Sequence, residues 1–113
     1  MKIKYYRNKA DKLWYLKLLK PKCEVCGEKA IHVHHFYYKS TYGHLRYDLD
    51  NGISLCMKCH FALHTRDPKR IEELIIEARG KRWYNRLKKK SRTIPKNYKT
   101  NITYYKNIIE ELK

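Results

Sequence analysis

The chain has 113 residues and a formal net charge of +16, from 27 Lys and Arg against 11 Asp and Glu, which predicts one small domain with terminal extensions and a polyanionic partner. No apolar run reaches the roughly 20 residues that a membrane span requires, and residues 1–5 lack the apolar region of a signal peptide. We therefore expect a cytoplasmic protein with no membrane partner, in which paired cysteines are metal ligands rather than disulfides.

The first part of the chain predicts a helix, a cysteine turn and a strand. Leucines at helical spacing predict a helix over residues 9–20, which Pro21 ends. Cys23 and Cys26 then begin a short metal-binding turn. Residues 30–36 alternate apolar side chains with histidines, a pattern typical of a strand.

The remaining elements follow from turn and capping signals. A polar, Tyr-rich loop over residues 39–50 separates the first strand from a short return strand at residues 53–55. A helix begins near Met57, and Asp67 followed by Pro68 begins a second helix, because this order is favoured at helix N-termini. Further along we expect a helix over residues 81–90, a linker over residues 91–99 and a helix over residues 103–112.

Basic side chains concentrate in the two flanks of the chain. Residues 78–109 contain no Asp or Glu, and the stretch up to Lys22 contains Asp11 as its single acid. Such flanks indicate a nucleic-acid partner, although a solvated surface would also be rich in lysine. Arg46 is a candidate phosphate contact that could instead pair with Asp48 or Asp50. The residues expected to contact the nucleic acid are Arg46, Lys81, Arg82, Arg86, Lys88, Lys89, Lys90 and Arg92.

Two Cys-x-x-Cys pairs indicate a structural zinc ion. Cys23 with Cys26, and Cys56 with Cys59, have the spacing of a tetrahedral site with four thiolate ligands. A hairpin must project from the resulting knuckle, because many residues separate the two pairs. The segment from Cys56 to His60 also fits a c-type haem attachment, but haem would leave the first pair unexplained.

The histidines predict a second, chemically distinct site. His34 and His35 are neighbours in a predicted strand, so their side chains point to opposite faces. His60 and His64 lie one helical turn apart and can hold one ion together. A neutral imidazole can take a proton from water near pH 7, so these residues suit a hydrolase. Asn51 could fix a loop backbone or orient an imidazole.

These residues form a recognisable constellation. The run HHF at residues 34–36, followed by NGISLCMKCH at residues 51–60, resembles the HNH endonuclease motif. The resemblance implies that His35 is the general base and Asn51 the central asparagine. It also implies a divalent ion held by His34, His60 and His64, with a structural Zn²⁺ on the four cysteines. The divalent ion expected is Mg²⁺ or Mn²⁺, and other divalent ions stay open.

The same resemblance implies the fold and its division. We expect an α+β fold: a small ββα-metal core with a four-cysteine zinc knuckle, flanked by an N-terminal helix and basic C-terminal helices. The expected division is a basic helix over residues 1–22, the zinc-knuckle HNH core over residues 23–66 and a basic helical extension over residues 67–113.

The expected function is metal-dependent hydrolysis of DNA phosphodiester bonds. Residues 45–51 and the basic segment 82–87 extend the likeness to NinG/Rap-type phage recombination nucleases, which implies branched DNA such as Holliday junctions or D-loops. Two alternatives stay open: a non-catalytic, zinc-stabilised nucleic-acid-binding module, and a homing or restriction-type HNH nuclease on duplex DNA. Junction cleavage would favour a homodimer, whose contact the apolar faces of the last helices could supply.

Overall fold

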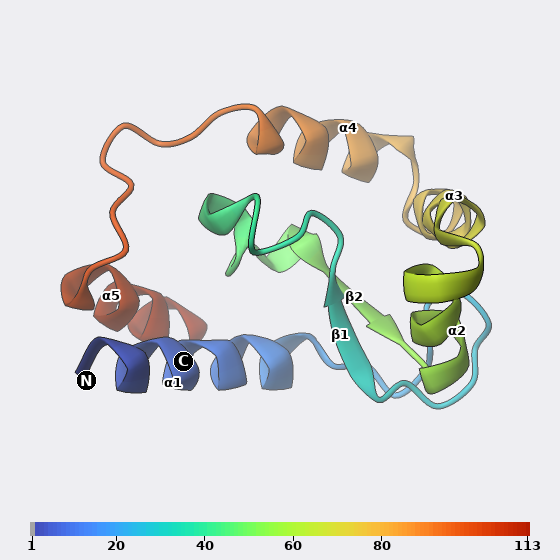
Figure 1. The fold of residues 1–113 in the computed structure, drawn as a ribbon, viewed down its shortest axis with the longest axis horizontal. Coiled ribbons are helices and arrows are strands. Elements are labelled where there is room, and N and C mark those ends of the chain that lie inside the picture. The colour runs from blue at the N-terminus through green and yellow to red at the C-terminus, as the bar shows by residue number, and fades with distance from the viewer. Residues whose placement is uncertain (1) are drawn as a thin grey trace.

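A two-stranded hairpin lies among five helices in the computed structural model, which describes residues 2–113 (Figure 1). The hairpin and the helix that follows it form a small ββα unit, so the expected α+β fold is confirmed. Helix α1 (Lys2–Leu18) begins earlier than the predicted start at residue 9. The added turns carry charged and aromatic side chains without a regular apolar stripe, so their helical periodicity was not visible in the sequence.

The hairpin places the histidine doublet beside the return strand. Strand β1 (His32–His35) pairs antiparallel with strand β2 (Gly52–Leu55), with His34 opposite Ile53 and His35 opposite Gly52. All four residues of β2 are buried, whereas His34 is the buried residue of β1. The strand alternation therefore turns His34 inward and its neighbours the other way.

Helix α1 packs directly on this hairpin, and Gly52 makes the close approach possible. A Cβ atom at Gly52 would lie 2.9 Å from Cζ2 of Trp14 and 3.1 Å from a methyl carbon of Val33, and would overlap Leu18. Contacts below 3.0 Å essentially never occur for real Cβ atoms, so any other residue at this position would force Leu18 and Trp14 to move.

The helices after the hairpin begin and end at the residues that their capping chemistry favours. Helix α2 (Met57–Phe61) continues into a π-helical turn (Ala62–Arg66), and helix α3 (Pro68–Arg79) follows. The Asp67 side chain caps α3 by accepting from the Arg70 N–H, and Gly80, at a φ of 97°, ends it. Helix α4 (Lys81–Ser91) and helix α5 (Ile102–Leu112) complete the chain.

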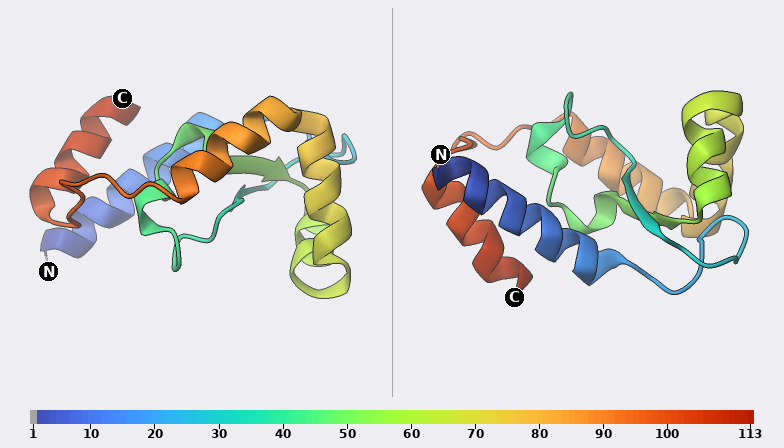
Figure 2. Two further views of the ribbon diagram at one scale, coloured as in Figure 1. Left: turned by 90° about the horizontal axis from the view of Figure 1, so that it is seen from above. Right: turned by 60° about the horizontal axis from the view of Figure 1, so that its bottom comes forward.

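Two apolar clusters hold these elements together. The first lies between the hairpin, the cysteine turn and helices α2 to α4, and includes Ile53, Leu63 and Leu87. The second joins α1 to α5 through Trp14 and Tyr105, and the two helices lie side by side in both figures (Figures 1 and 2). Because α1 covers the apolar face of α5, this face is not free to supply the expected dimer contact, and the homodimer stays a prediction. Within residues 2–113, no helix combines the length and the apolar character that crossing a membrane demands.

Candidate metal centres

The four cysteines gather at one point beneath the hairpin. The Sγ atoms of Cys23, Cys26, Cys56 and Cys59 all lie within 4.8 Å of one another, and those of Cys26 and Cys56 are 3.5 Å apart. A tetrahedral zinc with bonds of about 2.3 Å requires sulfur atoms roughly 3.7 Å apart. Gly27, at a φ of 82°, closes the first cysteine turn. The donor set and its spacing therefore fit a zinc ion.

The charge state of these thiols also favours a bound cation. Burial raises the pKa of the Cys59 thiol, and the neighbouring sulfurs raise it further. At Cys23 burial acts in the same sense, but backbone N–H donors from Cys26, Cys56 and Val25 outweigh it and lower the pKa to about 7. Metal binding displaces the thiol protons and leaves four thiolates. Four negative charges this close together repel one another, so they require a positive charge between them. The cluster thus suggests a structural zinc.

A buried ion pair ties the cysteine turn to the rest of the fold. Glu24, between the first two cysteines, accepts hydrogen bonds from the Arg79 guanidinium at the end of α3 and, at 2.7 Å, from the Ser54 N–H of β2. Arg79 also donates to the Gly52 carbonyl at 2.8 Å. The Glu24 and Arg79 side chains are only 10% and 18% exposed, so the pair fixes the knuckle against the hairpin.

A second cluster consists of imidazoles alone. Ring nitrogens of His34, His60 and His64 lie within 4.8 Å of one another, and the Nε2 atoms of His60 and His64 are 3.0 Å apart. His34 comes from β1, and the other two come from α2 and its π-helical turn. Metal–nitrogen bonds of about 2.0–2.1 Å place neighbouring ligand atoms roughly 3 Å apart, so a small inward adjustment lets all three bind one ion.

The protonation of these rings suits metal binding. Burial, with the neighbouring His60 and His64 rings, lowers the pKa of His34 to about 3. Burial likewise lowers the pKa of His60. These two imidazoles are therefore neutral at pH 7, which is the form that binds a metal.

His35 occupies different surroundings from His34, as the strand alternation predicts. Its ring stacks on Trp14 of α1, with ring centroids 4.1 Å apart and planes inclined by 8°, and its Nε2 lies 2.9 Å from the Arg46 carbonyl oxygen. A carbonyl oxygen can only accept, so Nε2 carries the proton and Nδ1 keeps the lone pair. Burial lowers the pKa of His35, which leaves the ring neutral at pH 7.

One pocket joins His35 to the imidazole cluster. This pocket of about 300 Å³ is lined by Val33, His34, His35, Tyr38, Lys39, Ser40, His60 and His64. Among the described residues that line it there is no carboxylate. Neither Trp14 nor the pocket residues Tyr38, Lys39 and Ser40 were predicted from the sequence, because none of them belongs to a spacing motif.

Asn51 is fully buried and fixes the loop that precedes it. Its Oδ1 accepts from the Tyr37 N–H at 2.8 Å, and its Nδ2 donates to the carbonyls of Tyr37 at 3.0 Å and Leu45 at 3.1 Å. All three of these hydrogen bonds go to backbone atoms. Of the two predicted roles, the structure therefore supports the one in which Asn51 fixes a loop backbone.

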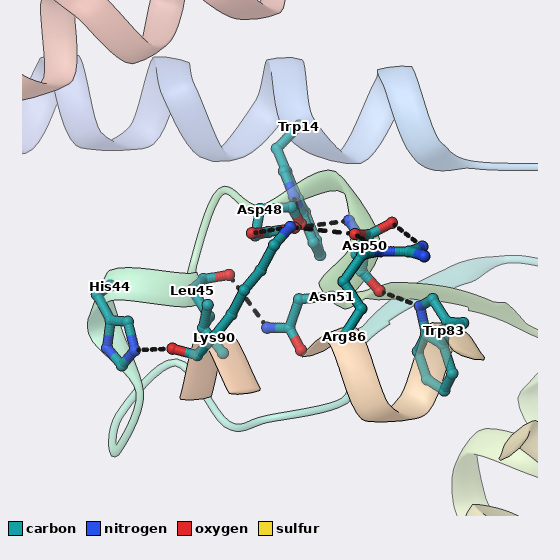
Figure 3. Close-up of polar contacts among 9 residues, drawn as sticks. All are labelled: Trp14, His44, Leu45, Asp48, Asp50, Asn51, Trp83, Arg86 and Lys90. Carbon is teal, nitrogen blue, oxygen red and sulfur yellow. Dashed lines mark hydrogen bonds and ion pairs between the residues drawn. The ribbon is translucent and has the colours of Figure 1, made fainter. Parts of the chain in front are cut away.

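The loop around Asn51 is held from both sides by helices (Figure 3). The Trp14 indole of α1 donates to the Asp48 carbonyl at 3.2 Å, and the Trp83 indole of α4 donates to the Asp50 carbonyl at 2.8 Å. Lys90 pairs with both carboxylates, each at 3.1 Å. The loop backbone is thus clamped between α1 and α4.

These contacts change the interpretation of several basic residues. Arg46 forms a bidentate pair with Asp11 of α1, so the predicted pairing with Asp48 or Asp50 is wrong. Those two acids instead hold cations of α4, namely Arg86 and Lys90. Five of the expected DNA contacts have no carboxylate within salt-bridge distance in residues 2–113: Lys81, Arg82, Lys88, Lys89 and Arg92.

Residues 23–66 match the family model described as HNH endonuclease. The matched segment contains both metal clusters, the hairpin and Asn51, and it indicates a nuclease domain that acts on nucleic acid. The match specifies no subtype, so the NinG/Rap-type likeness stays a prediction. No curated protein and no solved structure matches this chain.

Proposed function

We propose that this protein is a metal-dependent HNH endonuclease that hydrolyses phosphodiester bonds of DNA. The observation that carries the proposal is the convergence of His34, His60 and His64 on one pocket that His35 also lines. A binding module without catalysis would need the cysteine cluster for its fold, but it would have no use for a second, separate cluster of imidazoles.

His35 is the proposed general base. Its Nδ1 lone pair can accept a proton from the attacking water, and its lowered pKa keeps that lone pair free at neutral pH. The Trp14 ring and the Arg46 carbonyl hold the imidazole in one orientation. Asn51 acts indirectly in this proposal, because it fixes the loop that ends at Leu45, next to Arg46.

The proposed catalytic ion is held by His34, His60 and His64. When bound, such an ion neutralises charge on the phosphate and on the departing oxygen. Three imidazoles suit a transition ion better than Mg²⁺, which prefers oxygen ligands. Of the two ions expected from the sequence, we therefore favour Mn²⁺.

We propose that the flanking helices bind the DNA backbone around this core. Lys39 lies in the pocket and is placed to contact the phosphate that is cut. The exposed cations of α4 and the linker, Lys81, Arg82, Lys89 and Arg92, would contact phosphates further away. In this proposed division, residues 23–66 contain the catalytic and metal-binding side chains, and residues 67–113 bind DNA. Branched DNA is the substrate we would test first.

The test compares wild-type protein with His35→Ala on plasmid, duplex, single-stranded, flap and four-way-junction DNA, with Mn²⁺ or Mg²⁺. His44→Ala is the matched control, because His44 lies outside the pocket and contacts the Lys90 carbonyl. We expect cleavage by the wild type and the control and loss of cleavage in His35→Ala. Equal cutting by all three proteins would refute the assignment of His35. Salt-sensitive binding without cleavage under any condition would favour the non-catalytic module.

A further inference from the structure

Helix α2 carries an exposed apolar stripe next to its metal-binding face. Met57 and Phe61 lie one turn apart, and their side chains are 67% and 56% exposed. An α-helix turns by about 100° per residue, so Phe61 follows directly around the helix from His60. Two large apolar side chains exposed side by side on one helix are typical of a surface that binds a ligand.

A wide pocket with a basic rim adjoins this stripe. The pocket has a volume of about 740 Å³, and Ile31 and Ala62 contribute to its apolar floor beside Met57 and Phe61. The Arg66 guanidinium carbon lies 6.0 Å from the centre of the Phe61 ring. The charged residues of the rim are Lys29, Lys58 and Arg66 against one acid, Glu28.

We propose that this surface, the Phe61 face, binds an unpaired nucleotide of the DNA substrate near the bond that is cut. The base stacks on the Phe61 ring, and the flanking phosphates contact Lys58 and Arg66. Proteins that bind single-stranded nucleic acid without sequence preference combine stacking aromatic side chains with a basic groove in this way, since every base has a π-face. The proposal rests on the nuclease function proposed above.

The position of the Phe61 face determines which nucleotide it takes. A rise of about 1.5 Å per residue separates Met57 from His64 by roughly 10 Å along α2 and its π-helical turn. One DNA strand advances roughly 3.4 Å per nucleotide, so the stacked base lies within about three nucleotides of the catalytic ion. In a duplex that base is paired and already stacked on its neighbours, so the Phe61 face selects DNA with unpaired nucleotides at the cut.

The charge of the Phe61 face favours a nucleotide over a second copy of the protein as its ligand. A homodimer across the Phe61 face would bring two sets of Lys29, Lys58 and Arg66 together in a chain of net charge +16. A polyanion meets the same cations with attraction. A ligand that matches both the apolar floor and the basic rim must combine a flat apolar group with phosphates, and a nucleotide has both.

The test measures binding separately from cleavage, in the His35→Ala background. Fluorescence anisotropy follows labelled oligothymidylate, either single-stranded or paired with oligoadenylate. Phe61→Ala is compared with Phe61→Trp, which keeps a stacking ring, and with Ile94→Ala, which removes a side chain of similar exposure in the linker. Far-UV circular dichroism and zinc content check that each variant is folded.

We expect Phe61→Ala to weaken single-strand binding roughly 5- to 150-fold, the loss of one stacked base. Phe61→Trp and Ile94→Ala should bind like the parent, and duplex binding should change little. Unchanged single-strand affinity in Phe61→Ala, or an equal loss on duplex, would overturn the proposal. If Phe61→Ala kept its single-strand affinity but converted a dimer to a monomer, the Phe61 face would join two copies of the protein and the proposal would also be wrong. Wild-type cleavage is scored independently, so failure of this proposal can be distinguished from failure of the proposed nuclease function.

Discussion

Replacing Asn51 by aspartate tests whether this residue acts through the loop backbone. The change is nearly isosteric and keeps the acceptor that faces the Tyr37 N–H. It replaces the Nδ2 donor with an oxygen that faces the carbonyls of Tyr37 and Leu45, at 3.0 and 3.1 Å. Each buried polar group left without its partner costs about 1–3 kcal/mol, so we expect a loss of about 2–6 kcal/mol in the free energy of unfolding. Asn85→Asp, at an exposed position on α4, should change it by less than about 0.5 kcal/mol.

The pH dependence of Asn51→Asp makes the test sharper. Burial beside two carbonyl oxygens should raise the pKa of the new carboxyl in the folded state above its unfolded value of about 3.9. The protonated acid can donate to one carbonyl, so the destabilisation should be smallest at low pH and should grow as the pH rises through the folded pKa. Urea denaturation of the zinc-loaded protein at several pH values measures both effects. A variant within about 0.5 kcal/mol of the wild type at pH 8 would refute our account of Asn51.

Three further outcomes are expected. Cys26→Ser should lower both the zinc content measured by mass spectrometry and the melting temperature, because it removes one of the four thiolate ligands. Cys26 is exposed, so the substitution leaves no buried cavity that could lower the melting temperature by itself. An unchanged zinc content would exclude Cys26 as a ligand. Cleavage should be faster with Mn²⁺ than with Mg²⁺ at equal concentration, and the reverse order would show that oxygen ligands, not three imidazoles, hold the ion. Arg86, with Lys90, lowers the pKa of Asp50, so this acid stabilises the fold above its unfolded pKa, and the contribution disappears as the pH falls through the lower folded pKa. Melting curves should therefore show a weaker acid dependence in Asp50→Asn than in the wild type, and equal dependence would mean that the pairs with α4 contribute nothing.

The sequence predicted those features that depend on local spacing. Two Cys-x-x-Cys pairs specify a knuckle because zinc accepts four thiolates with little demand on the surrounding chain. The i, i+4 spacing of His60 and His64 gave their common face, and Asp67 with Pro68 gave the start of α3. In each case the physical cause acts within a few residues.

Features that depend on packing between distant segments were not predictable. Nothing near Trp14 in the sequence indicates that it stacks on His35, and nothing near Asp11 indicates that it pairs with Arg46. Both contacts exist because α1 crosses the hairpin at Gly52, a geometry set by tertiary packing. The ion-pair partner of Asp48, Lys90, was missed for the same reason, since it lies on α4.

The two metal clusters share one short helix, which links the proposed catalytic centre to the structural one. Helix α2 and its π-helical turn are too short to be helical in isolation, so their shape must come from what holds them. Cys56 and Cys59 fix the first turn through the sulfur cluster, and His60 follows on the next face, towards β1. A zinc ion held by the cysteines would therefore help to fix the distance between His60 and His34. Loss of zinc would separate these two ligands and weaken the catalytic site without any change in the imidazoles themselves.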